Sequence, residues 1–158
     1  NGPRDPADDD KAWPAQHWIA TLRALREDHP AARIVLCGVS NEAPLLDALA
    51  REARVTGVEV AAHELPLRRL MALAEIADGM LSVDTGPAHV AAAMGCPLIV
   101  LFGAQSPDAW CPRSSTGSAV IALGGPPQYS RVSEIGPDEV VAALCSLAPR
   151  DPELPRAA

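Results

Sequence analysis

Short apolar runs alternate with amphipathic segments along most of the chain. The runs at 33–38, 79–84 and 96–103 fit buried strands, and weaker runs at 55–61 and 118–123 fit two more. Strands that alternate regularly with helices predict an α/β fold whose parallel sheet is covered on both faces. Right-handed crossovers then make the fold class a Rossmann-like, doubly wound parallel sheet.

Apolar residues at helical spacing, together with prolines at first turns, predict the helices between these strands. The helices are expected at about 14–29, 44–51, 66–77, 88–94 and 137–147. In the second, Leu45, Leu46 and Leu49 should face inward. In the third, the apolar stripe consists of Leu67, Leu70, Met71 and Ala74.

The composition is that of a folded domain with one core. The chain has 158 residues, of which 48% are hydrophobic and 21% charged. Its net charge is −7, and Lys11 is its single lysine. Because no face of clustered arginine with interleaved aromatics is present, broad nucleic-acid binding is excluded, and attraction to an anionic membrane is not favoured.

The four cysteines are isolated in the sequence. Cys37, Cys96, Cys111 and Cys145 form no Cys-x-x-Cys pair and have no histidine at ligand spacing, so we expect no metal site. Cys37 and Cys96 fit small buried apolar residues. No apolar run reaches the ~20 residues of a membrane span, and the acidic start is not a signal peptide. These features predict a cytoplasmic protein.

Three segments are expected. Residues 1–10 are an acidic N-terminal segment that starts with a turn-like Asn-Gly-Pro, where this architecture normally has a strand, so the first strand is expected to be missing. Residues 11–148 are expected to be the ligand-binding Rossmann-like domain. Residues 149–158 form a proline-rich tail.

The sharpest chemical candidate runs from Asp84 to His89, where a predicted strand meets a helix start. Gly86 allows close backbone approach, and the free N–H groups of the first turn suit a diphosphate. Thr85 adds a hydroxyl donor, and His89 can reach a phosphate or a sugar hydroxyl. Asp84 would repel phosphate and fits a sugar hydroxyl better. The alternative is purely structural, with Thr85 as a helix cap and His89 as a packed side chain.

Three further positions have both a ligand and a structural interpretation. Lys11 precedes a helix start, where it fits an anionic ligand or a solvated charge offset by Asp8, Asp9 and Asp10. Glu42 follows a predicted strand and fits a ribose-binding acid or an acid in a first helical turn. The loop 103–107 also follows a strand, and it either lines the same crevice or is a turn capped by Ser106.

Taken together, these segments resemble glycosyltransferase family 9, the lipopolysaccharide heptosyltransferases. The resemblance rests on Lys11-Ala12-Trp13-Pro14, Gly38 to Glu42, Asp84-Thr85-Gly86-Pro87-Ala88-His89, Gly95-Cys96-Pro97, Leu101-Phe102-Gly103, Ser106-Pro107 and Trp110-Cys111-Pro112. It implies the C-terminal, donor-binding half of a GT-B fold. The family pattern also differs here, with Ala88 in place of a larger residue and Cys111 in place of glycine.

The resemblance implies an ADP-heptose-like donor and a lipopolysaccharide-core acceptor, and a cytoplasmic protein at the inner face of the bacterial inner membrane. Lys11 would contact the donor phosphate, Glu42 the ribose, and Asp84, Thr85, Gly86 and His89 the diphosphate and sugar. Transfer would be inverting and independent of metal or cofactor, with the general base in an N-terminal domain missing from this chain. The alternatives are a non-catalytic nucleotide- or sugar-binding module and another GT-B enzyme such as a UDP-sugar epimerase.

Overall fold

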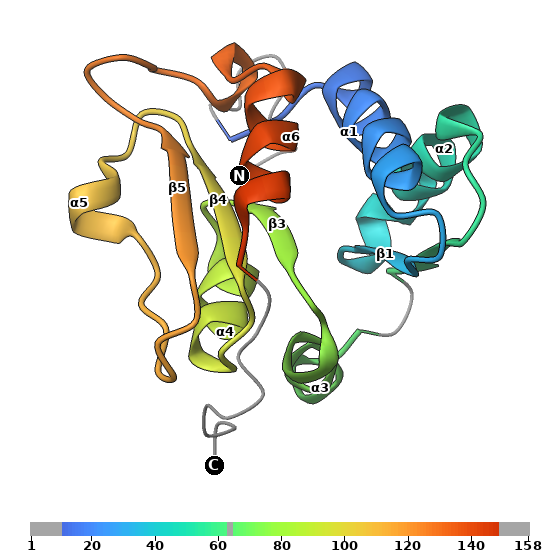
Figure 1. Ribbon diagram of the computed structural model, residues 1–158, viewed down its shortest axis with the longest axis horizontal. Coiled ribbons are helices and arrows are strands. Elements are labelled where there is room, and N and C mark those ends of the chain that lie inside the picture. Colours follow the sequence, from blue (N-terminus) through green and yellow to red (C-terminus); the bar gives the residue numbers. More distant parts are fainter. Residues whose placement is uncertain (1–10, 63–64, 149–158) are drawn as a thin grey trace. The chain divides into compact units, whose positions relative to one another are not determined.

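The computed structural model describes residues 11–62 and 65–148, which form two compact units. One unit is Pro14–Arg69, and the other comprises residues 11–13 and 70–148. Each contains a parallel sheet of its own (Figure 1). The predicted acidic segment and proline-rich tail, and with them the prediction of a missing first strand, lie outside the described residues.

The unit Pro14–Arg69 is built on a parallel pair of strands. Strand β1 (Ile34–Cys37) pairs with β2 (Val58–Ala61), and the helices are α1 (Ala15–Asp28), the short 3-10 helix η2 (Ser40–Glu42) and α2 (Ala43–Ala53). Helix α1 follows Pro14, as predicted, and buries Ile19 and Leu22. These two side chains join the core of this unit with Ile34, Leu49 and Ala53.

The prediction for Leu45 on α2 is wrong, because this side chain is 56% exposed. Leu49 and Ala53 are buried, and Leu46 packs against the same core. Leu45 precedes Leu46 by one residue, which places it about 100° round the helix. Its apolar character therefore gave no information about which face is covered.

Helix α3 (Leu67–Ile76) shows a similar correction. Leu70 and Ala74 are buried, whereas Leu67 is 60% exposed and Met71 36%. Leu67 and Met71 are four residues apart and share one face, while Leu70 and Ala74 share the neighbouring face. The buried stripe is therefore narrower than the apolar stripe in the sequence.

The second unit has a three-stranded parallel sheet with β4 (Leu98–Phe102) between β3 (Met80–Val83) and β5 (Val120–Gly124). All five side chains of β4 are fully buried. Since successive side chains of a strand point to opposite faces, both faces of this sheet are covered, as the sequence predicted.

The remaining elements of the second unit include α4 (Gly86–Ala93), α5 (Pro107–Trp110), η3 (Val132–Glu134) and α6 (Pro137–Ser146) (Figure 1). Ala88, Ala91 and Ala92 of α4 are buried, and they join one core with alternate residues of β4. Small side chains let the helix approach the sheet closely. Within the described residues, the sequence's single predicted sheet is present as two separate sheets of two and three strands.

Candidate functional site

The candidate site lies at the carboxyl ends of β3 and β4, where ligands of open α/β sheets bind. Asp84 follows β3 directly, and its backbone N–H donates to the Leu101 carbonyl at 3.0 Å. Residues that follow these two neighbouring strands line a cavity of about 330 Å³, within the range of small-molecule sites. Its lining consists of Lys11, Asp84, Thr85, Gly86, His89, Gln105 and Trp110.

An ion pair between Lys11 and Asp84 lies in this cavity. Lys11 Nζ lies 3.0 Å from Asp84 Oδ2 and donates a second hydrogen bond of 2.8 Å to the Asp84 carbonyl. The Asp84 side chain is 10% exposed and the Lys11 side chain 39%. Lys11 is therefore held at the cavity by Asp84, whereas the aspartates considered as its alternative partners lie outside the described residues.

Trp13 fixes the segment that carries Lys11. Its indole is 5% exposed, and its Nε1–H donates to the Ile135 carbonyl at 2.9 Å. A buried indole needs such an acceptor for its one donor. The two residues of the Lys-x-Trp-Pro motif therefore have different roles. Trp13 anchors the backbone in the core, and Lys11, two residues before it, reaches the edge of the sheet.

The start of α4 offers an anion fewer donors than the sequence suggested. Pro87 carries no N–H, and the Ala88 N–H donates to the Thr85 carbonyl at 3.0 Å. Of the first three helical residues, Gly86 therefore keeps the N–H that can serve an anion. A Cβ added at Gly86 would have no atom within 4 Å, so a ligand can approach this backbone closely.

Thr85 occupies the N-cap position of α4, but its side chain makes no capping hydrogen bond. The hydroxyl instead donates to the Val83 carbonyl at 3.2 Å. Its two acceptor lone pairs are then directed away from that bond. The purely structural interpretation of Thr85 as a helix cap is therefore incomplete.

His89 lies one turn into α4 and lines the same cavity. Its Nε2 is 4.0 Å from Asp84 Oδ1, and the side chain is 49% exposed. Asp84 thus lies between a cation and an imidazole, with one carboxylate oxygen toward each. This geometry differs from that of a packed core histidine.

The loop after β4 contributes Gln105 to the cavity, which agrees with the interpretation that this loop lines the crevice. Ser106 stands at the N-cap of α5 but makes no side-chain capping bond. Trp110 also lines the cavity, but the sequence predicted no role in the site for it. Its position could have indicated one, because this aromatic residue follows a Ser-Pro helix start at the end of a strand.

Cys111 is close enough to Asp84 to respond to its charge. Burial, and secondarily the Asp84 carboxylate, raise the pKa of the Cys111 thiol. The thiol therefore stays protonated near neutral pH and is a poor nucleophile. Burial also raises the pKa of the Cys37 thiol, which is half-buried rather than fully buried as predicted.

Glu42 belongs to the other unit, where it stands at the end of η2. Its Oε2 accepts a hydrogen bond of 2.8 Å from the Val39 N–H. A Cβ added at Gly38 would lie 2.7 Å from that same oxygen and 2.8 Å from Leu46 Cδ1. Glycine at position 38 is thus what lets the carboxylate fold back over the end of β1.

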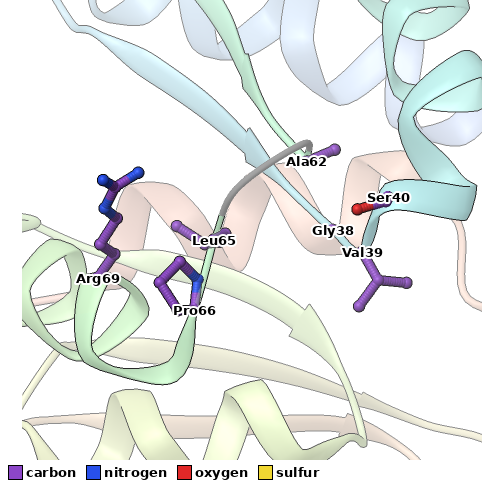
Figure 2. Close-up of a pocket in the computed structure, with 7 residues that line it drawn as sticks. All are labelled: Gly38, Val39, Ser40, Ala62, Leu65, Pro66 and Arg69. Carbon is purple, nitrogen blue, oxygen red and sulfur yellow. The ribbon is translucent and has the colours of Figure 1, made fainter.

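A second cavity, of about 420 Å³, lies at the carboxyl ends of β1 and β2. Figure 2 shows Leu65, Pro66 and Arg69 on one side and the Gly38–Ser40 turn on the other. Ala62, which follows β2, completes the lining. The side chains are mostly apolar, as in sites that take a flat organic ring.

In the part of the chain that the structure describes, no three His, Cys, Asp or Glu side chains are grouped so as to hold a metal ion. The helices of residues 11–62 and 65–148 include none that is long and apolar enough to cross a membrane.

The fold and these cavities define a Rossmann-like α/β protein with ligand cavities at the carboxyl ends of its strands. The sequence matches the model of glycosyltransferase family 9 (heptosyltransferase) over residues 5–134, and the chain belongs to this family. The resemblance inferred from the motifs is therefore confirmed. Lipopolysaccharide heptosyltransferase 3 of Escherichia coli is 29% identical over 105 residues, which are 66% of this chain and 31% of that protein.

Solved structures give the same result for the fold. The structure of E. coli heptosyltransferase WaaC with ADP matches with a TM-score of 0.74 and 26% identity, over 89% of this chain and 41% of that one. E. coli ADP-heptose lps heptosyltransferase II matches at 0.68 and 26%, over 87% and 42%. A family 9 glycosyltransferase from Veillonella parvula matches in fold at 0.70 with 20% identity.

These matches confirm the predicted α/β class and its relation to GT-B heptosyltransferases. The chain spans about two fifths of the length of the solved relatives and about a third of the curated one.

Proposed function

We propose that the chain is the donor-binding part of a lipopolysaccharide heptosyltransferase and that it takes an ADP-heptose-like nucleotide sugar. The observation that carries this proposal is the cavity in which the Lys11–Asp84 pair, Gly86 and His89 converge. The solved relative named with ADP supports adenine as the base, and the relative named for ADP-heptose supports the sugar.

In this proposal the diphosphate and the sugar bind in the cavity beside α4. The Gly86 N–H and the positive end of the helix dipole stabilise phosphate oxygens, and Lys11 adds a full charge. Asp84 Oδ1 accepts hydrogen bonds from sugar hydroxyls, because Oδ2 is occupied by Lys11. His89 and the Thr85 hydroxyl supply further polar contacts.

The unit Pro14–Arg69, taken by itself, has features that suit a nucleoside. Its cavity has the apolar lining that a nucleobase requires, formed by Val39, Leu65 and Pro66 among others. Glu42, held by the Val39 N–H, is proposed to accept hydrogen bonds from the ribose hydroxyls. The predicted role of Glu42 thus has a positioned carboxylate to support it.

The proposed transfer is inverting and metal-independent. The bond from the anomeric carbon to the β-phosphate oxygen breaks as the acceptor hydroxyl attacks, and the leaving diphosphate gains negative charge. Lys11, the Gly86 N–H and the His89 imidazole stabilise that charge. The lipopolysaccharide-core acceptor and the general base are assigned outside residues 11–148.

The test is calorimetric titration of the full-length protein with ADP and with UDP. We expect ADP to bind more tightly, and His89→Ala to weaken that binding about tenfold, as loss of one charged or polar phosphate contact implies. Turnover of ADP-heptose with a lipopolysaccharide-core acceptor tests the reaction itself. Tighter UDP binding would favour an epimerase, and ADP binding without transfer would favour a binding module.

A further inference from the structure

Trp110 is an exposed aromatic side chain in an otherwise polar cavity. Trp110 is 56% exposed as a residue, whereas Trp13 is 5% exposed. It shares the 330 Å³ cavity with an ammonium, a carboxylate, a hydroxyl, an imidazole and an amide, from Lys11, Asp84, Thr85, His89 and Gln105. An aromatic side chain that lines a cavity together with a few polar groups is the arrangement found in small-molecule sites.

The backbone under this indole is fixed. The Trp110 N–H donates to the Ser106 carbonyl at 3.1 Å, and the next residue, Cys111, donates to the Pro107 carbonyl at 2.8 Å. Cys111 also packs against the core formed by α4 and β4. Because the backbone of Trp110 and of the next residue is held, the indole is presented at the cavity with little backbone entropy to lose.

A diphosphate alone gives this indole nothing to contact, since phosphate groups have no apolar face. A sugar ring does, because its C–H bonds form an apolar face while its hydroxyls project from the edge. The indole face carries the negative part of its quadrupole and attracts C–H groups made positive by neighbouring oxygens. The polar groups that share the cavity with Trp110 are suited to the hydroxyl edge of the same ring.

We propose that Trp110 is the stacking platform for the sugar ring of the nucleotide-sugar donor. This inference rests on the proposed function and extends it: Trp110 gives the protein its preference for the nucleotide sugar over the bare nucleotide. The indole contributes to ADP-heptose binding and leaves ADP binding unchanged.

The experiment measures the affinity of the full-length protein for ADP-heptose and for ADP, by calorimetry, in wild type, Trp110→Ala and Trp110→Phe. We expect Trp110→Ala to weaken ADP-heptose binding about tenfold, a typical loss for one stacked aromatic contact, and to leave ADP binding within about twofold. Trp110→Phe keeps an aromatic face and should lose about threefold. Ile76→Ala, a second exposed apolar side chain at 75%, is the control and should change neither affinity.

Intrinsic fluorescence supplies a second measurement that a merely structural role would not affect. ADP-heptose should change the tryptophan emission more than ADP does, and this difference should vanish in Trp110→Phe. Melting temperatures of all variants establish that they are folded.

The outcomes separate the two proposals. Equal losses of ADP and ADP-heptose binding in Trp110→Ala would overturn the inference, because the indole would then contact the nucleotide. No loss of either would also overturn it and leave the proposed function intact. A wild-type protein that binds neither compound would overturn both.

Discussion

Replacing Lys11 with alanine should weaken ADP binding about 30-fold. The ammonium lies 3.0 Å from the Asp84 carboxylate, so its removal leaves a negative charge at the cavity proposed to take a diphosphate. Two unit charges about 4 Å apart interact by about 1 kcal/mol in bulk water and about 4 kcal/mol at the effective dielectric constant near a protein surface. The Lys11 side chain is 39% exposed, so an intermediate value of about 2 kcal/mol applies, which gives the 30-fold change.

The double variant Lys11→Ala/Asp84→Asn identifies the cause. It removes the cation and the anion together, so the cavity has the same formal charge as in wild type. If charge balance governs binding, the double variant should recover most of the affinity that the single variant loses. Calorimetric titration with ADP at low and at high salt measures both effects, because screening should narrow the difference.

Arg33→Ala is the matched control. Arg33 also pairs with a carboxylate, since its Nη2 lies 2.8 Å from Glu59 Oε1, but both side chains are exposed and line neither cavity. Its loss changes the net charge of the protein equally and should leave ADP affinity within about twofold. If Lys11→Ala behaves like Arg33→Ala, the assignment of Lys11 to the phosphate site is wrong.

Three further predictions concern the second unit. Gly86→Ala should keep the melting temperature, because its Cβ meets no atom within 4 Å, yet weaken ADP binding about tenfold by blocking approach to the backbone; unchanged affinity would contradict this. Gly124→Ala should lower the free energy of unfolding by about 2 kcal/mol or more in denaturant titration, because the φ of Gly124 is +82° and the added Cβ would meet the Phe102 carbonyl oxygen. Gly136→Ala is the control and should cost less than about 1 kcal/mol, because its Cβ would meet no atom within 4 Å. The hydrogen bond to Glu139 is the main cause that raises the pKa of Tyr129 above its ordinary value near 10. The contact therefore stabilises the fold fully below about pH 10, and this stabilisation is lost as the pH rises through the folded-state pKa. Since Tyr129 is the single tyrosine of the sequence, its ultraviolet absorbance gives that pKa directly, and Glu139→Ala should lower it.

The sequence predicted the elements well where burial is complete. The run at 96–103 contains β4, whose side chains are fully buried, so its apolar pattern has one interpretation. Pro137 and Pro14 marked helix starts because proline suits a first turn and not a helix interior. Boundaries shifted where the chain is half-exposed: the run 55–61 became Val58–Ala61, since the positive φ of Gly57 at +70° precedes the strand.

Which apolar face is covered could not be predicted. The apolar residues of α2 and α3 cover more of the helix surface than their neighbours bury, and Leu45, Leu67 and Met71 remain exposed. Periodicity reports where a helix could bury side chains, and the packing partners decide where it does.

For the candidate site, local motifs predicted most of the lining but not its pairing. Thr85, Gly86 and His89 follow Asp84 within five residues, so the strand-to-helix motif brings them together by itself. The contact between Lys11 and Asp84 joins residues 73 positions apart, which no local spacing rule connects. The anchoring role of Trp13 could not be predicted either, because the acceptor of its indole N–H is a backbone carbonyl 122 residues away.

The pairing also changes the physical role of Asp84. Considered alone, the carboxylate would oppose a phosphate; paired with Lys11 at 3.0 Å, it reduces the attraction of the cavity for anions without abolishing it. In the proposed transfer, this restraint would favour release of the product diphosphate, a step that limits turnover in many enzymes.

Asp84→Asn should therefore tighten ADP binding, by about threefold to tenfold at low salt, since one unit of opposing charge is lost while a carbonyl acceptor remains for Lys11. In the proposed reaction, the same variant should release ADP more slowly and turn over less often, which stopped-flow displacement of ADP would detect. The effect should shrink at high salt, where the Debye length falls to about 3 Å at 1 M. Weaker ADP binding in Asp84→Asn would instead mean that the carboxylate serves to position Lys11, and that position rather than charge balance limits the affinity.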